Sequence, residues 1–161
     1  TEFNWPLFEG PHSPAGRDVS VDEEAQADYL VRYYLLTLCT GLAERVFWWQ
    51  LIARGYGLVS PGDGSRLRRR SAYAALRTLV ERLRDSRFVG PLDGDPDSRL
   101  YLFERGGDEM VVAWSVDGRG RATLPRPAIR VTGRDGQDLR TPDGTGIELG
   151  SSPIYYDLVP R

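Results

Sequence analysis

Two segments in the first half of the chain carry apolar residues at the spacing of an α-helix. In residues 21–40 and just beyond, they recur every three or four positions and predict one broad apolar face: Leu30, Val31, Tyr34, Leu35, Leu38 and Leu42. Ser20 followed by Glu23 forms a capping box that predicts the start of this helix, and Gly41 predicts its end. The same spacing predicts a second helix over residues 71–84.

Each predicted helix is preceded by an aromatic-rich segment. Residues 45–51 read Arg-Val-Phe-Trp-Trp-Gln-Leu, a short continuous apolar run typical of a strand buried on both faces of a parallel sheet. The opening Thr-Glu-Phe-Asn-Trp ends at Pro6, as at the tip of a strand that runs into a loop. The first half is therefore predicted to be α/β, in the order strand, helix, strand, helix.

The second half has a different pattern, in which Asp-Gly pairs at 93–94, 117–118, 135–136 and 143–144 separate short strand-like runs as hairpin turns do. The predicted strands cover residues 100–104, 110–116, 121–124, 128–132, 147–149 and 154–158. We predict two domains, an α/β part over residues 1–87 and an all-β part, a small antiparallel β-sandwich, over residues 88–161. The boundary is expected near Arg87.

Composition and charge exclude several classes of function. The chain of 161 residues has 21 basic residues, all arginine, against 23 acidic ones, and its net charge of −2 favours neither nucleic acid nor anionic lipid as a partner. The longest apolar stretch, residues 29–39, contains Arg32 and is too short to insert across a membrane. With Cys39 and His12 as the single residues of their types, we expect no disulfide framework, no metal site and no cofactor.

Five segments then follow one another in a familiar order. They are Thr1-Glu2-Phe3-Asn4-Trp5, Glu24-Ala25-Gln26-Ala27, Val46-Phe47-Trp48-Trp49, Tyr56-Gly57-Leu58-Val59 and the stretch Arg-Arg-Ser-Ala-Tyr-Ala-Ala-Leu over residues 69–76. Together they resemble the C-terminal end of a clan A glycoside hydrolase, closest to glycoside hydrolase family 39 and its exopolysaccharide-hydrolase relatives. The chain departs from that family at Asn4, where glycine is usual, and at Ser71, where proline is common.

The resemblance implies a fold and an origin. Residues 1–87 would supply the last two βα units of a TIM (β/α)₈ barrel, and residues 88–161 an accessory β-sandwich. Because a complete barrel takes about 250 residues, we expect the chain to be a piece of a longer polypeptide, with the missing N-terminal barrel portion as its partner. Two βα units alone would expose their barrel-facing side and should self-associate. The resemblance to this family also implies a secreted or periplasmic protein.

The resemblance also assigns the chemistry of a retaining glycosidase to Glu2. In the family, the glutamate of a Thr-Glu-Phe-Gly-Trp-like stretch ends the seventh strand and is the catalytic nucleophile. A retaining enzyme needs a second carboxyl group about 5–5.5 Å away, and the family's general acid/base follows the fourth strand, upstream of this sequence. The expected substrate is a β-linked oligo- or polysaccharide.

A tryptophan of the eighth strand should lie beneath the sugar. Alternation along the strand predicts that Val46 and Trp48 face the barrel interior and that Phe47 and Trp49 face the helices. Trp48 is therefore the predicted sugar platform, and Trp49 takes its place if the register slips by one residue. Trp5 is expected to line the cleft from the loop after Glu2.

Other candidates are interpreted more simply. Glu9 is expected to be a surface charge in a mobile loop, the arginine run over residues 66–70 a solvated loop, and Cys39 an inert buried thiol. The alternative function is a non-catalytic carbohydrate-binding or structural β-sandwich module. A flat, exposed aromatic face formed by Trp114, Tyr101 or Tyr155 would favour it, although Trp114 is most simply a core residue.

Overall fold

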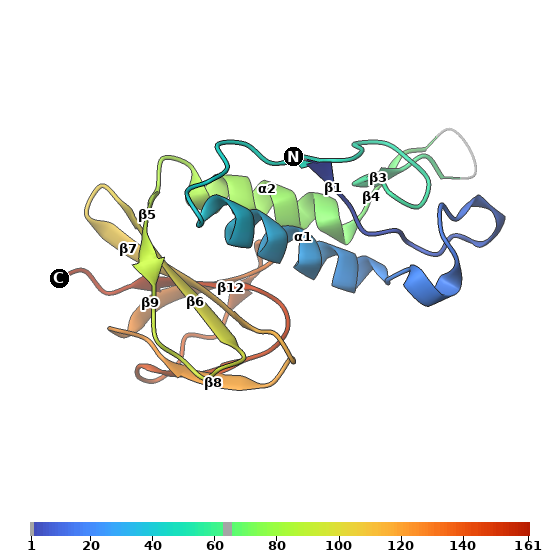
Figure 1. Ribbon diagram of the computed structural model, residues 1–161. Coiled ribbons are helices and arrows are strands. Elements are labelled where there is room, and N and C mark those ends of the chain that lie inside the picture. The colour runs from blue at the N-terminus through green and yellow to red at the C-terminus, as the bar shows by residue number, and fades with distance from the viewer. Residues whose placement is uncertain (1, 63–65) are drawn as a thin grey trace. The chain divides into compact units, whose positions relative to one another are not determined.

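The computed structural model describes residues 2–62 and 66–161 (Figure 1). The chain forms two compact units, Thr1–Arg77 and Thr78–Arg161, and the division falls inside helix α2 (Ser71–Leu83). The predicted boundary near Arg87 coincides with the start of β5 (Arg87–Pro91), where the chain changes from helix to antiparallel strands. An α/β arrangement followed by an all-β arrangement is thus confirmed.

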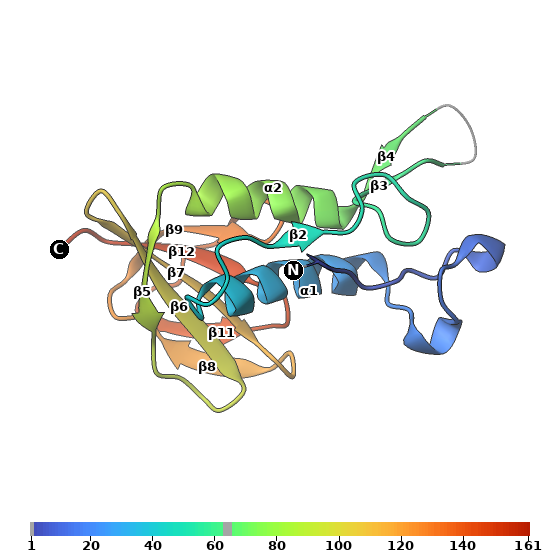
Figure 2. The same cartoon turned by 45° about the horizontal axis from the view of Figure 1, so that its top comes forward.

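The first unit is built on a strand–helix–strand motif. Strands β1 (Glu2–Phe3) and β2 (Phe47–Trp48) pair in parallel, and the chain between them contains α1 (Glu23–Leu38). Two 3₁₀ turns, Gly10–His12 and Arg17–Val19, lie between β1 and α1. After β2, the antiparallel pair β3 (Val59–Ser60) and β4 (Arg68–Arg69) leads into α2 (Figure 2).

Helix α1 begins at a different cap from the predicted one. The Asp22 carboxylate, not the Ser20 hydroxyl, accepts the first free amide, that of Ala25, at 2.7 Å. Ser20 instead donates its hydroxyl to the carbonyl of Gly16 at 2.9 Å. Aspartate is as good an N-cap as serine, and its position two residues later delays the helix start. The buried apolar face consists of Ala27, Leu30, Val31 and Leu35, whereas Leu38 and Leu42 are exposed, contrary to the prediction.

The strand predicted over residues 45–51 is shorter and less buried than its composition indicates. Only Phe47 and Trp48 pair as a strand, and Phe47 is 53% exposed. Leu51 and Ile52 are exposed as well. A strand is buried on both faces only where neighbours cover both, and among the described residues β2 pairs with β1 alone.

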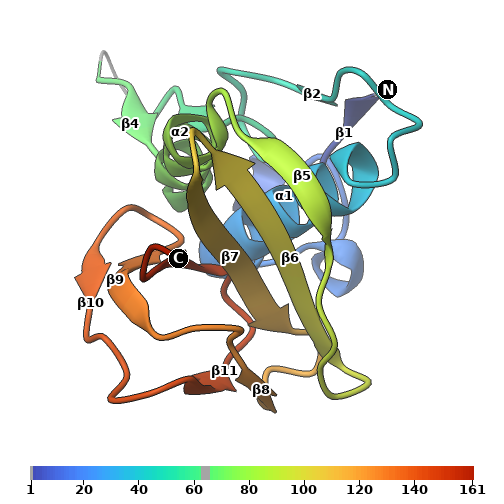
Figure 3. The same cartoon turned by 90° about the vertical axis from the view of Figure 1, so that its left-hand side faces the viewer.

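The second unit is all-β apart from the C-terminal part of α2. Its six-stranded antiparallel sheet has the order β10-β9-β12-β7-β6-β5, and a two-stranded antiparallel ribbon joins β8 to β11 (Figure 3). The strands after β5 are β6 (Ser98–Arg105), β7 (Asp108–Ser115), β8 (Gly120–Thr123), β9 (Ala128–Gly133), β10 (Asp138–Leu139), β11 (Gly146–Leu149) and β12 (Ile154–Leu158). All six predicted strands are present.

The ribbon covers one face of the six-stranded sheet. Apolar side chains from both layers form one core, which contains Leu100, Leu102, Val111, Ala113, Leu124, Val131, Ile147, Leu149, Tyr156 and Leu158. Tyr155 alternates with Tyr156 along β12 and points to the opposite face, where the Arg82 guanidinium of α2 lies 5.9 Å from its ring centre. Burial raises the pKa of Tyr155 far above its usual value.

Two of the four predicted Asp-Gly hairpins are correct. The pairs at residues 93–94 and 135–136 connect the adjacent strands β5–β6 and β9–β10. The pairs at residues 117–118 and 143–144 instead connect strands that do not pair with each other. The β6–β7 hairpin turns at Gly106 and Gly107, which both have positive φ, a backbone conformation that favours glycine.

Candidate functional site

The predicted site residues Glu2, Trp48 and Trp49 meet at the parallel pair of strands in the first unit. In this pair Glu2 lies opposite Phe47 and Phe3 lies opposite Trp48. The amide of Trp49 continues the ladder by donating to the carbonyl of Phe3 at 3.3 Å. Because the strands are parallel, the segments that follow them leave from the same edge, where a barrel enzyme carries its chemistry.

Trp48 lies on the face of this pair that packs against α1. The Phe3 ring packs against two tyrosines of α1, with ring centres 4.0 Å from Tyr33 and 5.2 Å from Tyr34, and it contacts Trp48 edge-on at 5.2 Å. Trp48 is therefore on the helix side. The prediction that Trp48 faces away from the helices is wrong, because Phe3, its cross-strand neighbour, packs on α1.

The opposite face of the pair is open. Glu2 is exposed there, together with Phe47, its cross-strand neighbour. Trp49 follows β2 directly, in a bend, and is 48% exposed. The fallback position for the sugar platform, Trp49, is thus exposed at the end of the strand that pairs with the strand of the candidate nucleophile.

Trp5 belongs to an aromatic cluster against α1, which consists of Phe3, Trp5, Tyr29, Tyr33, Tyr34 and Trp48. Its ring centre is 5.4 Å from that of Tyr29 and 6.5 Å from that of Trp48. The side-chain amide of Gln26 donates to its carbonyl at 2.7 Å. Burial raises the pKa of Tyr34, although a hydrogen bond to the Trp48 backbone acts in the opposite direction. The cluster supports Trp48 from behind the open face.

A tight turn follows β2 and contacts the segment that follows β1. We call residues 53–57 the glycine turn. Gly55 has a positive φ, and a Cβ there would lie 2.1 Å from Pro14. A Cβ at Gly57 would lie 2.3 Å from the backbone nitrogen of Ala53. Only glycine therefore fits at either position without a shift of the neighbouring chain.

Sequence reasoning missed the ion pair that lies behind this turn. The Arg70 side chain is fully buried and pairs with the Glu9 carboxylate. Glu9 itself is half-buried and held by this pair, not free in a mobile loop. The predictions of a solvated Arg70 and a surface Glu9 are wrong. The partners are 61 residues apart, so no local pattern reveals the pair. The only hint is that the arginine run ends where the apolar face of a helix begins.

Comparison with known proteins adds no family assignment. No protein-family model matches the chain, and no curated protein matches it.

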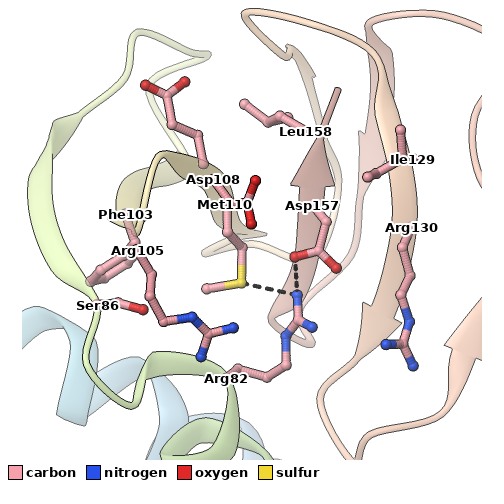
Figure 4. A pocket seen from close by; sticks show the side chains of 11 residues that line it. Arg82, Ser86, Phe103, Arg105, Asp108, Met110, Ile129, Arg130, Asp157 and Leu158 are labelled. Atoms are coloured by element: carbon pink, nitrogen blue, oxygen red, sulfur yellow. Dashed lines mark hydrogen bonds and ion pairs between the residues drawn. The ribbon is translucent and has the colours of Figure 1, made fainter. Parts of the chain in front are cut away.

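A cavity of about 270 Å³ in the second unit is the other candidate site (Figure 4). Arg82 dominates it, donating to the Asp157 carboxylate and to the sulfur of Met110, the latter at 3.1 Å. Glu109, which also lines the cavity, pairs with Arg126 and Arg161. These charged groups are already paired with one another, which is typical of a structural ion-pair network.

The rings named for a binding module do not form an exposed face. Trp114 and Tyr155 are buried, and Tyr101 is half-buried with its ring centre 5.5 Å from that of Trp114. Trp114 is thus a buried residue, as predicted. Neither helix of the described chain is long and apolar enough to cross a membrane.

Cys39 should react slowly with thiol reagents. It caps the C-terminus of α1 and is partly buried, whereas the sequence predicted a buried thiol. Desolvation nevertheless raises its pKa to about 11. Since the thiolate is the reactive form, alkylation by iodoacetamide at pH 7.5 should be about 100-fold slower in the folded chain than in urea. Equal rates in the two states would contradict this prediction.

Proposed function

We propose that this chain is the C-terminal portion of a retaining glycoside hydrolase that cleaves a β-linked oligo- or polysaccharide. The observation that carries the proposal is the parallel pairing of Glu2 with Phe47 and of Phe3 with Trp48. It brings together a carboxylate and an aromatic strand that are 45 residues apart along the chain (47 − 2). A retaining glycosidase needs a carboxylate that attacks the anomeric carbon, and an aromatic ring beside that carboxylate would support the sugar.

The same pairing supports a fragment of a (β/α)₈ barrel over residues 1–87. Parallel strands are normally covered on both faces, yet Phe47, Trp49, Leu51 and Ile52 are exposed in this chain. Further strands, supplied by an upstream barrel portion, would cover them and add the missing acid/base carboxyl group. Residues 88–161 would then serve as an accessory β-sandwich.

The role proposed for each residue follows from its position on the β1–β2 strand pair. The Glu2 carboxylate attacks the anomeric carbon, and the acid/base group protonates the departing oxygen and later activates water. Trp49 is favoured over Trp48 as the sugar platform, because it is exposed beside the strand pair that carries Glu2, whereas Trp48 packs on the helix side. Trp48 and Trp5 act from behind, by holding the strand pair against α1.

The alternative function, a non-catalytic carbohydrate-binding or structural β-sandwich module, has less support. Its sugar-binding form requires exposed aromatic rings on the second unit, and Trp114 and Tyr155 are buried.

The test of the proposal begins with the intact mass of the natural protein. A mass larger by roughly 200 residues would leave room for the rest of a barrel. That protein should then be incubated with 2-deoxy-2-fluoro glycosides that carry a good leaving group. The fluorine slows hydrolysis of the covalent intermediate, so a glycosyl adduct should accumulate on the peptide that contains Glu2. Labelling of a different carboxylate, or an intact mass of 18.1 kDa, would overturn the proposal.

A further inference from the structure

We propose that Arg70 and Glu9 are positioning residues, which hold the segment after β1 against the glycine turn after β2. This inference rests on the proposed function, because the two strand ends that they connect carry Glu2 and the Trp48–Trp49 pair. Neither Arg70 nor Glu9 would touch the substrate. They would act by fixing the strand ends relative to each other.

The Arg70 guanidinium is buried. Its side chain is 0% exposed, and a buried charge is very unfavourable unless it is paired and hydrogen-bonded. One terminal nitrogen, Nη1, donates to the carbonyl of Gly57 at 2.7 Å, and the other, Nη2, donates to Glu9. The planar fork of arginine can reach both acceptors at once, which the single ammonium of lysine cannot do in the same geometry.

Glu9 connects Arg70 to the backbone of the glycine turn. Its other carboxylate oxygen accepts the amide of Gly55 at 2.7 Å. The carbonyl of Gly55 in turn accepts the amide of Leu7, also at 2.7 Å. Two links thus join the segment after β1 directly to the glycine turn, and Arg70 ties both sides together.

The glycine turn contacts the candidate site itself. The carbonyl of Tyr56 accepts the indole N–H of Trp48 at 3.2 Å and the side-chain amide of Asn4 at 2.9 Å. Asn4 follows β1 directly, and Trp48 is the neighbour of Trp49 in the chain. A displacement of the turn would therefore move the strand ends that carry Glu2 and Trp49.

Glu23, which lies 3.6 Å from Nε of Arg70, also forms an ion pair of a different kind with Arg68. Arg68 donates to both carboxylate oxygens of Glu23, and this pairing raises the pKa of Arg68. The Arg68 side chain is nevertheless largely exposed, and it bonds to no carbonyl of the glycine turn. It is typical of surface pairs, which contribute little. The positioning role is therefore assigned to the buried Arg70.

We call the Arg70–Glu9 pair, with its hydrogen bonds to Gly55 and Gly57, the clamp. Hydrogen exchange of the 161-residue chain tests the clamp without any substrate. In Arg70→Met, the amide of Gly55 and the indole N–H of Trp48 should exchange about tenfold faster or more, while the amides of β7 stay unchanged. Arg70→Lys should restore part of the protection. The matched control is Arg69→Met, because Arg69 is an exposed neighbour that lies 4.8 Å from the Tyr73 ring centre. If Arg70→Met fails to fold, Glu9→Gln provides the same test at constant side-chain size.

Kinetics of the full natural protein then separate positioning from simple support. Misplacement by about 1 Å can cost on the order of 100-fold in rate, so Arg70→Met should lower kcat by roughly 10- to 100-fold. The pH profile should not move, because Arg70 contacts no ionising group of the reaction, and Arg70→Lys should recover part of kcat.

Each outcome of the exchange and kinetic experiments decides one part of the proposal. Unchanged exchange in both Arg70→Met and Glu9→Gln would refute the clamp, whatever the enzyme does. Faster exchange with an unchanged kcat would refute the positioning role and leave a structural one. A wild-type protein that cleaves no glycoside would refute the proposed function, and with it the role of Arg70 in the reaction. The exchange result would still decide whether the clamp exists.

Discussion

Replacing Glu2 by alanine in the full natural protein should lower glycoside cleavage by on the order of 10⁴-fold or more, the scale expected when a covalent nucleophile is lost. Glu2 is exposed on a two-residue strand, so its loss should leave the free energy of unfolding nearly unchanged. The measurement is kcat/KM on an aryl β-glycoside, with a thermal melt as the check on folding. Glu44→Ala is the control, because Glu44 is also exposed and lies outside the site.

Sodium azide should restore turnover in the Glu2→Ala protein and identify the role of the missing group. Azide would occupy the space of the carboxylate and attack the anomeric carbon, while the upstream acid/base donates its proton to the leaving oxygen. A single displacement inverts the configuration, so the product should be the α-glycosyl azide from a β-glycoside. A β-glycosyl azide would assign Glu2 to the acid/base role, and activity close to wild type without azide would remove it from the mechanism.

The second unit could be predicted from the sequence because its signals are local. Alternating residues define each strand, and the core contains the inward-facing members of those strands, among them Leu100, Leu102, Val111 and Ala113. The choice of partner strand is less local. The Asp-Gly dipeptides at residues 117–118 and 143–144 have the turn chemistry of a hairpin, but β8 pairs with β11 instead of with β7. Turn residues indicate where the chain reverses and leave the partner of each strand open.

The candidate site was harder to predict because it depends on contacts between distant segments. Aromatic composition located β2 correctly, but the face of Trp48 depends on its pairing with Phe3 and on the position of α1. Arg70 reads as part of a charged, solvated run until Glu9 and the carbonyl of Gly57 are placed beside it. The fold class therefore followed from periodicity, whereas the burial of charges did not.

Truncating Leu100 to alanine should destabilise the second unit by about 2–5 kcal/mol. Leu100 is 2% exposed in β6 and lies in the core between the six-stranded sheet and the β8–β11 ribbon. The loss combines the transfer free energy of the removed methyl groups with the cavity that a two-layered sheet cannot close. Urea unfolding followed by far-ultraviolet circular dichroism measures the change.

Leu139→Ala is the matched control for this prediction. It removes the same atoms from β10, at the edge of the same sheet, where Leu139 is 37% exposed. Because that side chain is already partly in water, its loss should cost less than about 1 kcal/mol. Equal effects of the two substitutions would mean that the core under the ribbon is loosely packed, and that the ribbon does not exclude water from the sheet as the burial of Leu100, Leu124 and Leu149 implies.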